Sequence, residues 1–475
     1  MASKTRMAKK KLVLLSLGLF LLAVWVPFLS FLIWFAFIPL LLAIHGETSA
    51  KSFLIGLLTG AFFFSGLLYW IVQYELRIFV LVIIFTAPFF GMFAWLTQRL
   101  WNHFKNDFVQ ILAPSIAWAA VGVLYWLTPV SIIGDQIAFF QAPFFPAIVR
   151  CSGISGITFL ILLNNSLLAH WLKTKKNKFL VGNGMMVILL CAGHFVLLDP
   201  PKVKPIKVAL IQHNLPMASN EWRLSHQKKI TWKYEKAVLE FGSDHDLILF
   251  PQYGLPFDPL RKPERFDQLA KRKNTSILLG TYIPKIAGGS LTEGARTDSA
   301  LLFSAKTTVQ EYQAVTPPPF RNIKQVKGSD RMPLTLSDGT KIGIMLCYED
   351  SRSEEGRLWV RNGAELLAAL SNPGHFLGTP LPRYHLLQDR IRAIETGRYL
   401  ARVSPNGFSA LIDPNGKIMI QSKLHEETVV KGEIYALSGR TIFTNLGPVV
   451  PLASAGIGLF LLIGSYPVRK KKASN

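Results

Sequence analysis

Long apolar runs fill the first 200 residues of this chain and limit its fold more than any other feature of the sequence. A helix that crosses the hydrocarbon core of a bilayer needs about 20 predominantly apolar residues. The first run, Leu12–Ile44, is too long for one span and contains Pro27, so we divide it in two, which gives eight predicted spans. The other runs are Ser52–Tyr74, Ile78–Gln98, Phe108–Leu127, Cys151–Leu172, Phe179–Leu198 and Val449–Tyr466.

Basic residues cluster beside these runs. The clusters are Lys4–Lys11 before the first span, Lys173–Lys178 between the sixth and seventh, and Arg469–Lys472 after the last. With eight spans all three lie on one side of the membrane, which the positive-inside rule makes the cytoplasm. The net charge of +23 is therefore better explained by membrane topology than by binding to nucleic acid. A cleaved signal peptide is the alternative for the first run, but the many spans that follow favour an uncleaved anchor.

From about Pro205 to Thr444 the pattern becomes that of a soluble α/β domain. Short apolar runs alternate with polar, helix-capable segments, which is typical of a layered sandwich of sheets and helices. The sequence therefore predicts a membrane domain over residues 1–204 with seven spans, an external domain over 205–444, and a last span with a basic cytoplasmic tail over 445–475. The predicted strands are Val208–Gln212, Leu247–Phe250, Ser276–Gly280, Ser299–Phe303, Ile342–Leu346, Leu366–Leu370, Leu400–Val403, Ser409–Ile412 and Ile418–Ile420, and the predicted helices are Glu221–Phe241, Arg261–Lys273, Ser353–Asn362 and Pro382–Arg398.

One of these strands ends in a residue that can do chemistry. Lys341–Asp350 reads KIGIMLCYED, and Cys347 is the only cysteine of the hydrophilic domain, because the other two lie at or in predicted spans. A thiol at the end of a strand lies at the rim of a sheet, where a substrate can reach it. An unpaired cysteine in an external domain is a candidate reactive thiol. The alternative is a buried core cysteine, which is what most free cysteines are.

The order of these features resembles the apolipoprotein N-acyltransferases of bacterial inner membranes. The resemblance covers nearly the whole chain. It implies a multi-pass protein of the inner (cytoplasmic) membrane, with both termini in the cytoplasm and a nitrilase-like α-β-β-α domain outside, between the last two spans. The motifs that carry it are VALIQHNLP at Val208–Pro216, LILFPQYGLP at Leu247–Pro256, GIMLCYED at Gly343–Asp350, LLAALSNPGHFLG at Leu366–Gly378, and RAIETGRYLARVSPNGFSALIDPNG at Arg392–Gly416.

The resemblance also implies a reaction. The family transfers an acyl chain from a phospholipid, the acyl donor, to the amine of a lipoprotein's N-terminal diacylglyceryl-cysteine, the acceptor. It does so through a thioester on a cysteine and needs no cofactor. The nucleophile corresponds to Cys347; Tyr348 and Glu349 match the same motif, and Trp222 matches an aromatic residue that faces substrate in the family. The chemistry needs a thiolate, a carboxylate that moves a proton, and a cation or hydrogen-bond donors for the oxyanion.

Three positions depart from the family pattern. Gln252 occupies the position of the general base, where the family has glutamate after proline, and an amide cannot accept a proton from a thiol. Ala314 occupies the position of the family's lysine. Asn322 replaces a further glutamate. Without a base or a cation, a thiol with a pKa of about 8.5 is only a few per cent thiolate at neutral pH.

Several readings of this altered site stay open. Lys324 or Lys327 could replace the lost cation, and Glu349 the lost carboxylate, although exposed loop charges are the simpler interpretation of the two lysines. The protein is then an acyltransferase, a pseudoenzyme that binds lipid or lipoprotein without turnover, or an acyltransferase for another amine. A cysteine–histidine pair with His375 or His385 has only weak support. No histidine or cysteine cluster has the spacing of a metal site. Asn164 and Asn165, inside the sixth span, are predicted to hydrogen-bond to neighbouring helices.

Overall fold

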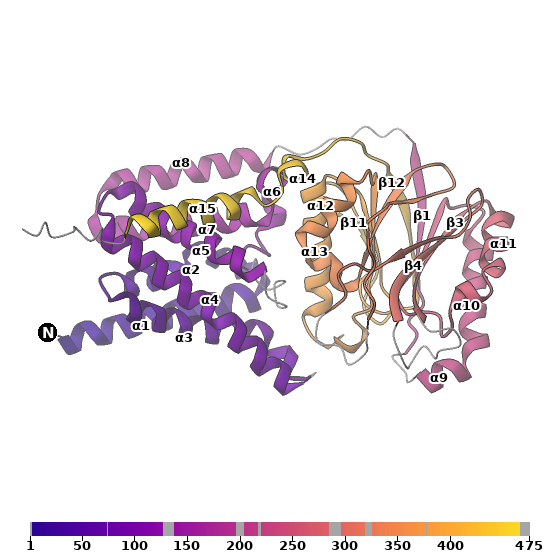
Figure 1. The fold of residues 1–475 in the computed structure, drawn as a ribbon, viewed down its shortest axis with the longest axis horizontal. Coiled ribbons are helices and arrows are strands. Elements are labelled where there is room, and N and C mark those ends of the chain that lie inside the picture. Colours follow the sequence, from indigo (N-terminus) through magenta and orange to yellow (C-terminus); the bar gives the residue numbers. More distant parts are fainter. Residues whose placement is uncertain are drawn as a thin grey trace, which may run out of the picture. The chain divides into compact units, whose positions relative to one another are not determined.

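The computed structural model describes residues 2–73, 75–126, 137–195, 204–216, 220–284, 296–318, 325–376 and 378–465. The chain divides into two compact units. One, here called the helical unit, consists of Met1–Val196 and Pro448–Asn475, and the other, here called the sandwich unit, consists of Leu197–Gly447. Figure 1 shows helices alone in the first unit and two sheets with flanking helices in the second.

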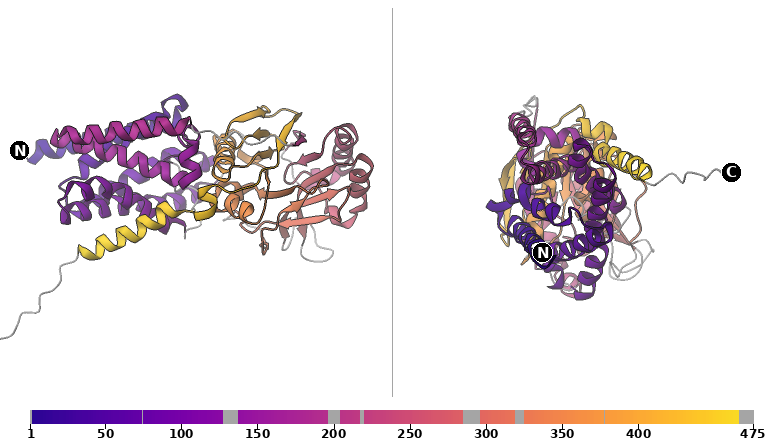
Figure 2. Two further views of the ribbon diagram at one scale, coloured as in Figure 1. Left: turned by 90° about the horizontal axis from the view of Figure 1, so that it is seen from above. Right: turned by 90° about the vertical axis from the view of Figure 1, so that its left-hand side faces the viewer.

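The helical unit is built from helices that run side by side (Figure 2). Its first apolar run is broken where the sequence predicts, because α1 ends at Trp25 and a 3₁₀ turn begins at Pro27. The helices are α1 (Ala2–Trp25), α2 (Ile33–Ile44), α3 (Ser49–Leu68), α4 (Leu76–His103), α5 (Asp107–Trp126), α6 (Pro146–Ser152), α7 (Ile154–Thr174), α8 (Asn177–His194) and α15 (Val449–Gly464).

The predicted count of eight spans is not confirmed. Among the described residues, five helices are long and apolar enough to cross a membrane. The segment Val449–Gly464 is apolar but has only 16 residues, about 24 Å at the helical rise of 1.5 Å per residue. The five are Pro27–Ile44, Ser49–Gln73, Leu76–His103, Asp107–Leu124 and Ile154–Thr174.

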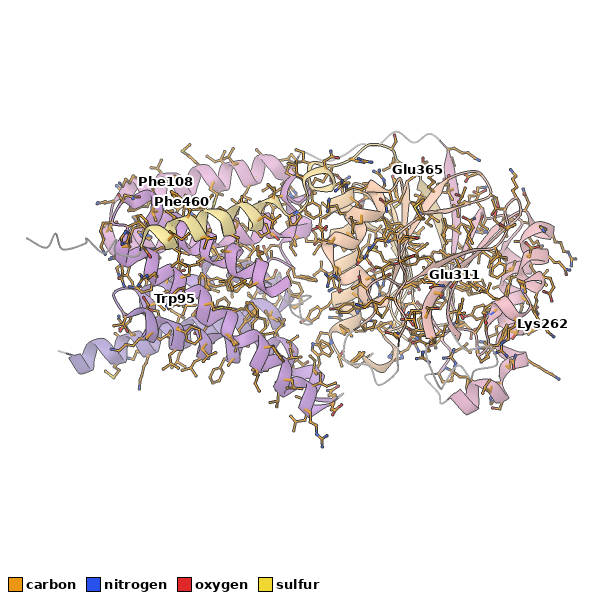
Figure 3. All side chains as sticks on the ribbon, viewed as in Figure 1. Trp95, Phe108, Lys262, Glu311, Glu365 and Phe460 are labelled. Carbon is orange, nitrogen blue, oxygen red and sulfur yellow. The ribbon has the colours of Figure 1, made fainter. Side chains whose placement is uncertain are left out.

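Buried aromatic rings and two asparagines hold the helical unit together. Phe20 of α1 contacts Phe37 of α2 edge to face at 4.7 Å, and Phe90 of α4 contacts Trp118 of α5 at 4.9 Å. Asn165 of α7 accepts hydrogen bonds from two backbone N–H groups of α2, and the neighbouring Asn164 donates to a backbone carbonyl at the start of that helix. The prediction for the two asparagines is confirmed. By contrast, the labelled Phe108 and Phe460 in Figure 3 are about three-quarters exposed, as lipid-facing residues would be.

The sandwich unit contains two six-stranded sheets, with strand orders β12-β1-β2-β3-β4-β5 and β11-β10-β9-β8-β7-β6. Each sheet has three central parallel strands, β1–β3 in the first and β7–β9 in the second. The strands are β1 (Pro205–Gln212), β2 (Leu247–Phe250), β3 (Ser276–Pro284), β4 (Arg296–Ser304), β5 (Gln310–Gln313), β6 (Leu334–Thr335), β7 (Lys341–Leu346), β8 (Leu366–Leu370), β9 (Leu400–Val403), β10 (Ala410–Ile412), β11 (Ile418–Gln421) and β12 (Thr428–Tyr435).

Alternation along the strands separates two cores. In β4, Ala300 and Leu302 belong to the core between the sheets, whereas Leu301 and Phe303 pack on the outer helices α10 (Gln227–Phe241) and α11 (Glu264–Lys273). Outside the second sheet lie α12 (Ser353–Arg361) and α13 (Leu381–Thr396). The result is the α-β-β-α sandwich that the resemblance implies. The remaining helices are the short α9 (Asn220–Ser225) and α14 (Ile442–Leu446).

The sequence located most of this sheet structure. Strands β2, β8 and β9 begin and end at the predicted residues. Three strands were missed, of which the longest is β12, paired antiparallel with β1 along its whole length. Its sequence TVVKGEIY contains a lysine, a glycine and a glutamate, so its apolar signal is weak.

Parallel strands bring their carboxyl ends to the same edge of a sheet. In the first sheet β2 ends at Phe250, just before Gln252, and in the second β7 and β8 end at Leu346 and Leu370, which are partners in the register. Gln252 and the Cys347 turn therefore lie at the carboxyl edges of central parallel strands, where ligands bind in sheets of this kind.

Candidate active site

Cys347 lies directly after β7, in a sharp change of backbone direction. Its φ is +50°, a left-handed conformation that residues with a Cβ rarely adopt. A 3₁₀ turn, η6 (Cys347–Ser351), starts at the cysteine. The side chain is half-buried, so the thiol is neither sealed in the core nor fully in water. Strained backbone of this sort is typical of functional sites.

Glu349, two residues later, is completely buried and fully hydrogen-bonded. Its Oε2 accepts from the backbone N–H of Leu346 at 2.9 Å, which closes the turn that carries the cysteine. Its Oε1 accepts from the Tyr312 hydroxyl at 2.7 Å and from the backbone N–H groups of Val315 and Thr316 at 2.9 and 3.1 Å. Glu349 thus ties the Cys347 turn to the segment after β5, which suits a positioning role.

The pKa of Glu349 reflects its burial. Burial, followed by the negative charge of Glu355, raises the pKa of Glu349 to about 8, against the opposing effect of its hydrogen bonds. Glu355 is held in turn by the guanidinium of Arg331, with contacts of 2.5 and 2.7 Å. Burial and the neighbouring Glu349 also raise the pKa of Tyr312 far above its ordinary value, so this hydroxyl remains a donor.

Gln252 is also completely buried, at the end of β2. Its amide nitrogen donates to the Tyr253 hydroxyl at 2.8 Å and to Oδ2 of Asp298 at 3.3 Å. The carboxylate partner identifies this end of the amide as the nitrogen, since a carboxylate only accepts. The amide oxygen of Gln252 accepts no hydrogen bond from any residue that the structure describes. A buried acceptor without a donor is rare in proteins and marks a place where a ligand group can bind.

Asp298 is a site residue that the sequence analysis missed. It lies in β4, is 2% exposed, and faces Tyr282 of β3 across the antiparallel ladder. Its backbone carbonyl accepts from the N–H of Ala314 at 2.8 Å, which brings the predicted lysine position directly beside β4. The sequence signal is that RTDSALLFS places an arginine and an aspartate two residues apart, just before the apolar run Ala300–Phe303.

Arg296 shares that strand face with Asp298. Its guanidinium lies 3.7 Å from the centre of the Tyr282 ring, and this ring stacks on Tyr253 with centroids 3.5 Å apart. Arg296 is 8% exposed, so its charge is largely removed from water. A cation over an aromatic face is stabilised by the ring's quadrupole.

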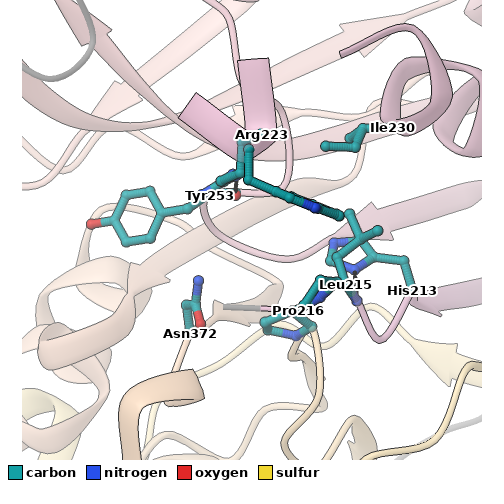
Figure 4. A pocket seen from close by; sticks show the side chains of 9 residues that line it. His213, Leu215, Pro216, Arg223, Ile230, Tyr253 and Asn372 are labelled. Carbon is teal, nitrogen blue, oxygen red and sulfur yellow. Dashed lines mark hydrogen bonds between the residues drawn. The ribbon is translucent and has the colours of Figure 1, made fainter. Parts of the chain in front are cut away.

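A small pocket that opens to solvent, with Tyr253 of this stack in its lining, is shown in Figure 4. Trp222 lines it and stacks on His226 at 4.1 Å. Arg223 crosses the pocket to the backbone carbonyls of Tyr253 and Gly254. The other lining residues are His213, Leu215, Pro216, Ile230, Tyr253, Asn372 and Pro405.

The structure gives His385 a role other than pairing with the thiol. Its Nδ1 hydrogen-bonds to both oxygens of Asp350, at 3.0 and 2.9 Å. Asp350 also accepts from Arg402, which in turn bonds to Asp389. Tyr348, the last predicted site residue of the turn, is half-buried in η6.

Of the two candidate lysines, the structure describes Lys327. Lys327 is exposed, although the backbone N–H of the next residue, Gly328, donates to Ala314 at 2.9 Å. Lys324, Asn322 and the side chain of His375 lie outside the described residues.

Comparison with known proteins matches both units. A family model described as carbon-nitrogen hydrolase matches residues 207–441, and one described as apolipoprotein N-acyltransferase N-terminal domain matches residues 17–167. The chain is similar to the apolipoprotein N-acyltransferase of Nitrosomonas europaea, with 25% identity over 81% of this chain and 80% of that one. It is similar to that of Geobacter metallireducens, with 26% identity over 89% and 88%. Among solved structures, a carbon-nitrogen hydrolase from Helicobacter pylori aligns with 49% of this chain and 90% of its own, at 15% identity and a TM-score of 0.40.

Proposed function

Because this chain belongs to the apolipoprotein N-acyltransferase family, we propose that it acylates lipoproteins through a thioester on Cys347. The acyl donor is a phospholipid, and the acceptor is the N-terminal amine of a diacylated lipoprotein. The observation that carries the proposal is the Cys347 turn: a half-buried thiol at the carboxyl end of β7, held in a left-handed conformation by the fully hydrogen-bonded Glu349.

The reaction has two displacements. In the first, Cys347 loses its proton, its sulfur attacks the ester carbonyl carbon, and the C–O bond breaks. The departing oxygen takes up a proton, so that the lysophospholipid leaves as an alcohol. In the second, the lipoprotein amine attacks the thioester carbonyl, loses a proton, and expels the thiolate. Trp222 and the pocket it lines are proposed to receive substrate, and Tyr348 to contact it next to the nucleophile.

The proposed setting is the bacterial inner membrane, with both termini cytoplasmic and the sandwich unit external. The apolar helices support a membrane protein. The charges of the helical unit support the orientation, because Lys9 before the apolar part of α1 pairs with Glu47 after α2, at 2.6 Å. Lys178, after α7, pairs with Asp107 at the start of α5, so two basic clusters are anchored at interhelical turns. The boundaries 1–204, 205–444 and 445–475 remain our proposal for the domains.

A second candidate function is binding of lipid or lipoprotein without turnover. Gln252 and Ala314 favour it, since neither can move a proton or stabilise an oxyanion by its charge. Members of one catalytic unit act together, so losing even one typically removes most of the rate enhancement.

Formation of an acyl-thioester distinguishes the two functions. The purified full-length protein, in detergent with phospholipid, is expected to gain the mass of one acyl chain. Hydroxylamine should release it, and Cys347→Ser, which has a far poorer nucleophile, should not form it at the same rate. Cys191→Ser, in the helical unit, is the matched control and should acylate normally. Absence of the adduct, with lipid still bound, would overturn acyl transfer and support the binding function.

A further inference from the structure

Of the three departures from the family pattern, Gln252 removes a negative charge and Ala314 a positive one, and β4 brings one of each. Asp298 and Arg296 are two residues apart, both at least nine-tenths buried, in a strand that neighbours both altered positions. Asp298 hydrogen-bonds to the side chain of Gln252 and, through its backbone, to Ala314. A buried carboxylate and a buried guanidinium are therefore present beside the two altered positions.

The pleat of β4 directs Asp298 toward the space between the sheets. Successive side chains of a strand alternate between its two faces, so Asp298 shares a face with Ala300 and Leu302. Both of those residues pack in the core between the sheets, together with Leu346 of β7, the residue before Cys347. The carboxylate therefore lies on the face of the first sheet that looks toward the sheet carrying the nucleophile.

Short contacts connect the two sides. The segment Ala314–Thr316 is bound at its start by the backbone carbonyl of Asp298 and at its end by Glu349 of the Cys347 turn. Across the sheets, Asn372 after β8 donates to the backbone carbonyl of Gln252 at 3.3 Å. Both routes bring the Gln252–Asp298 pair to the carboxyl ends of β7 and β8.

We propose that Asp298 is the proton acceptor for Cys347, in place of a glutamate at position 252; this inference rests on the proposed function. Asp298 takes the thiol proton as the sulfur attacks the ester carbonyl, and returns it to the departing lysophospholipid oxygen. In the second displacement it takes a proton from the attacking amine and returns it to the cysteine thiolate. The amide nitrogen of Gln252 stays hydrogen-bonded to Asp298 and orients its carboxylate toward the thiol.

The other buried carboxylates near the thiol are engaged differently. Both oxygens of Glu349 accept hydrogen bonds from the surrounding backbone and from Tyr312. Asp350 is bound by His385 and Arg402. Only Asp298 is joined to the residue at the position of the family's base. A distance of 3.3 Å is long for a hydrogen bond to a carboxylate, and hydrogen bonds in active sites commonly shorten once substrate binds.

The test exchanges the carboxylate and the amide across their shared hydrogen bond. Initial rates of thioester formation are measured for the full-length parent, Asp298→Asn, Gln252→Glu and the double variant Gln252→Glu/Asp298→Asn. Asp298→Asn is nearly isosteric, and its melting temperature in detergent checks that it folds. The pH dependence of the rate is recorded for each protein, because a residue with a purely structural role would not determine the pH profile.

We expect Asp298→Asn to lower the rate about 100-fold or more, the usual contribution of a general base. Its rate should then increase steadily with pH. It should lack the fall in rate at acidic pH that protonation of a carboxylate base causes in the parent. The double variant should recover most of the loss. Gln252→Glu alone should be slower than the parent at neutral pH, because two neighbouring carboxylates share one proton.

Two outcomes would overturn the role of Asp298. The first is a folded Asp298→Asn protein with the parent's rate and pH profile. The second is a parent that forms no thioester while Gln252→Glu does, which would show that the carboxylate is needed at position 252. If neither the parent nor any variant forms a thioester, the proposed function itself fails and the role of Asp298 fails with it, a pattern distinct from the other two.

Discussion

The strand ends that meet at the candidate active site differ in how completely their polar groups are paired. At the end of β7, Glu349 accepts four hydrogen bonds and fixes the backbone on both sides of the site. At the end of β2, the nitrogen of Gln252 is paired, whereas its oxygen has no partner among the described residues. Both side chains are equally buried. Burial alone therefore does not distinguish them; hydrogen-bond saturation does.

This difference separates residues that hold the nucleophile in position from residues that can take part in proton transfer. Glu349, whose two oxygens both accept hydrogen bonds, holds the nucleophile in place, and removing it leaves several buried donors without acceptors. A side chain with an unpaired atom can instead receive a group from substrate or nucleophile. We therefore assign the β7 end to positioning of Cys347 and the β2–β4 end to proton transfer, and the following variants test that division.

The largest effect on stability is expected from Glu349→Ala. It leaves the N–H groups of Leu346, Val315 and Thr316 and the Tyr312 hydroxyl without their acceptor, which costs about 3 kcal/mol or more in free energy of unfolding. Asp298→Asn should cost much less, because it keeps the shape and one acceptor oxygen. Denaturant unfolding of the full chain in detergent, followed by intrinsic fluorescence, measures both.

The control for Glu349→Ala is Glu427→Ala. Glu427 is exposed and pairs with Lys233 at 2.7 Å, and such surface pairs contribute about 0.5 kcal/mol. If Glu349→Ala were no more destabilising than this control, the β7 end would not have the supporting role that its hydrogen bonds indicate.

A smaller effect is expected from Gly280→Ala at the β2–β4 end. A Cβ on Gly280 would lie 2.7 Å from Cα of Gln252 and 2.9 Å from its backbone nitrogen. Because these are backbone atoms, the β2 end must shift, at a cost of about 1–3 kcal/mol. We expect the rate of thioester formation to fall by a larger factor than the loss of folded protein alone would cause. Gly378→Ala, with no atom within 4 Å of its Cβ, should change neither quantity, and a Gly280→Ala protein with normal activity would argue that the position of Gln252 is unimportant.

The sequence predicted the β7 end of the site better than the β2–β4 end. The apolar run before Cys347 and the carboxylates after it are adjacent in the chain, so their spatial relationship follows from the strand and the turn alone. The pairing of Gln252 with Asp298 joins residues 46 positions apart and depends on the register of β2, β3 and β4. No local pattern specifies that register, and β4 was predicted to start only at Ser299.

The same reasoning explains the prediction for Glu349. Sequence proximity to Cys347 made it a candidate for the lost base, but its four donors come from Leu346 and from the distant segment Tyr312–Thr316. Donors contributed by a distant segment are invisible in the sequence. In the helical unit, the apolar runs predicted helices, but both the length of a helix and its hydropathy determine whether it can span a bilayer.

The smallest expected effect is the change of the protein's stability with pH. It tests whether Glu349, at the β7 end of the site, is sealed from solvent. Burial raises the pKa of Glu349 to about 8 and that of Asp389, near the Cys347 turn, to about 7, above their ordinary values of 4.5 and 3.8. The folded protein therefore holds protons that the unfolded chain releases. Their stabilising contribution is complete below about pH 4 and is lost as pH rises through 7 to 8.

His213, which lines the pocket, acts in the opposite direction, because burial lowers its pKa to about 3. It favours folding above its ordinary pKa of 6.5 and opposes it as the pH falls below that value. The measurement is therefore the melting temperature of the full chain between pH 6.5 and 8.5, where we expect a decrease. Glu349→Gln, which cannot titrate, should reduce the slope, whereas Asp298→Asn should leave the contribution of Glu349 intact. A melting temperature that rises over this interval in the parent would contradict the raised pKa values and, with them, the picture of Glu349 as a sealed support for the nucleophile.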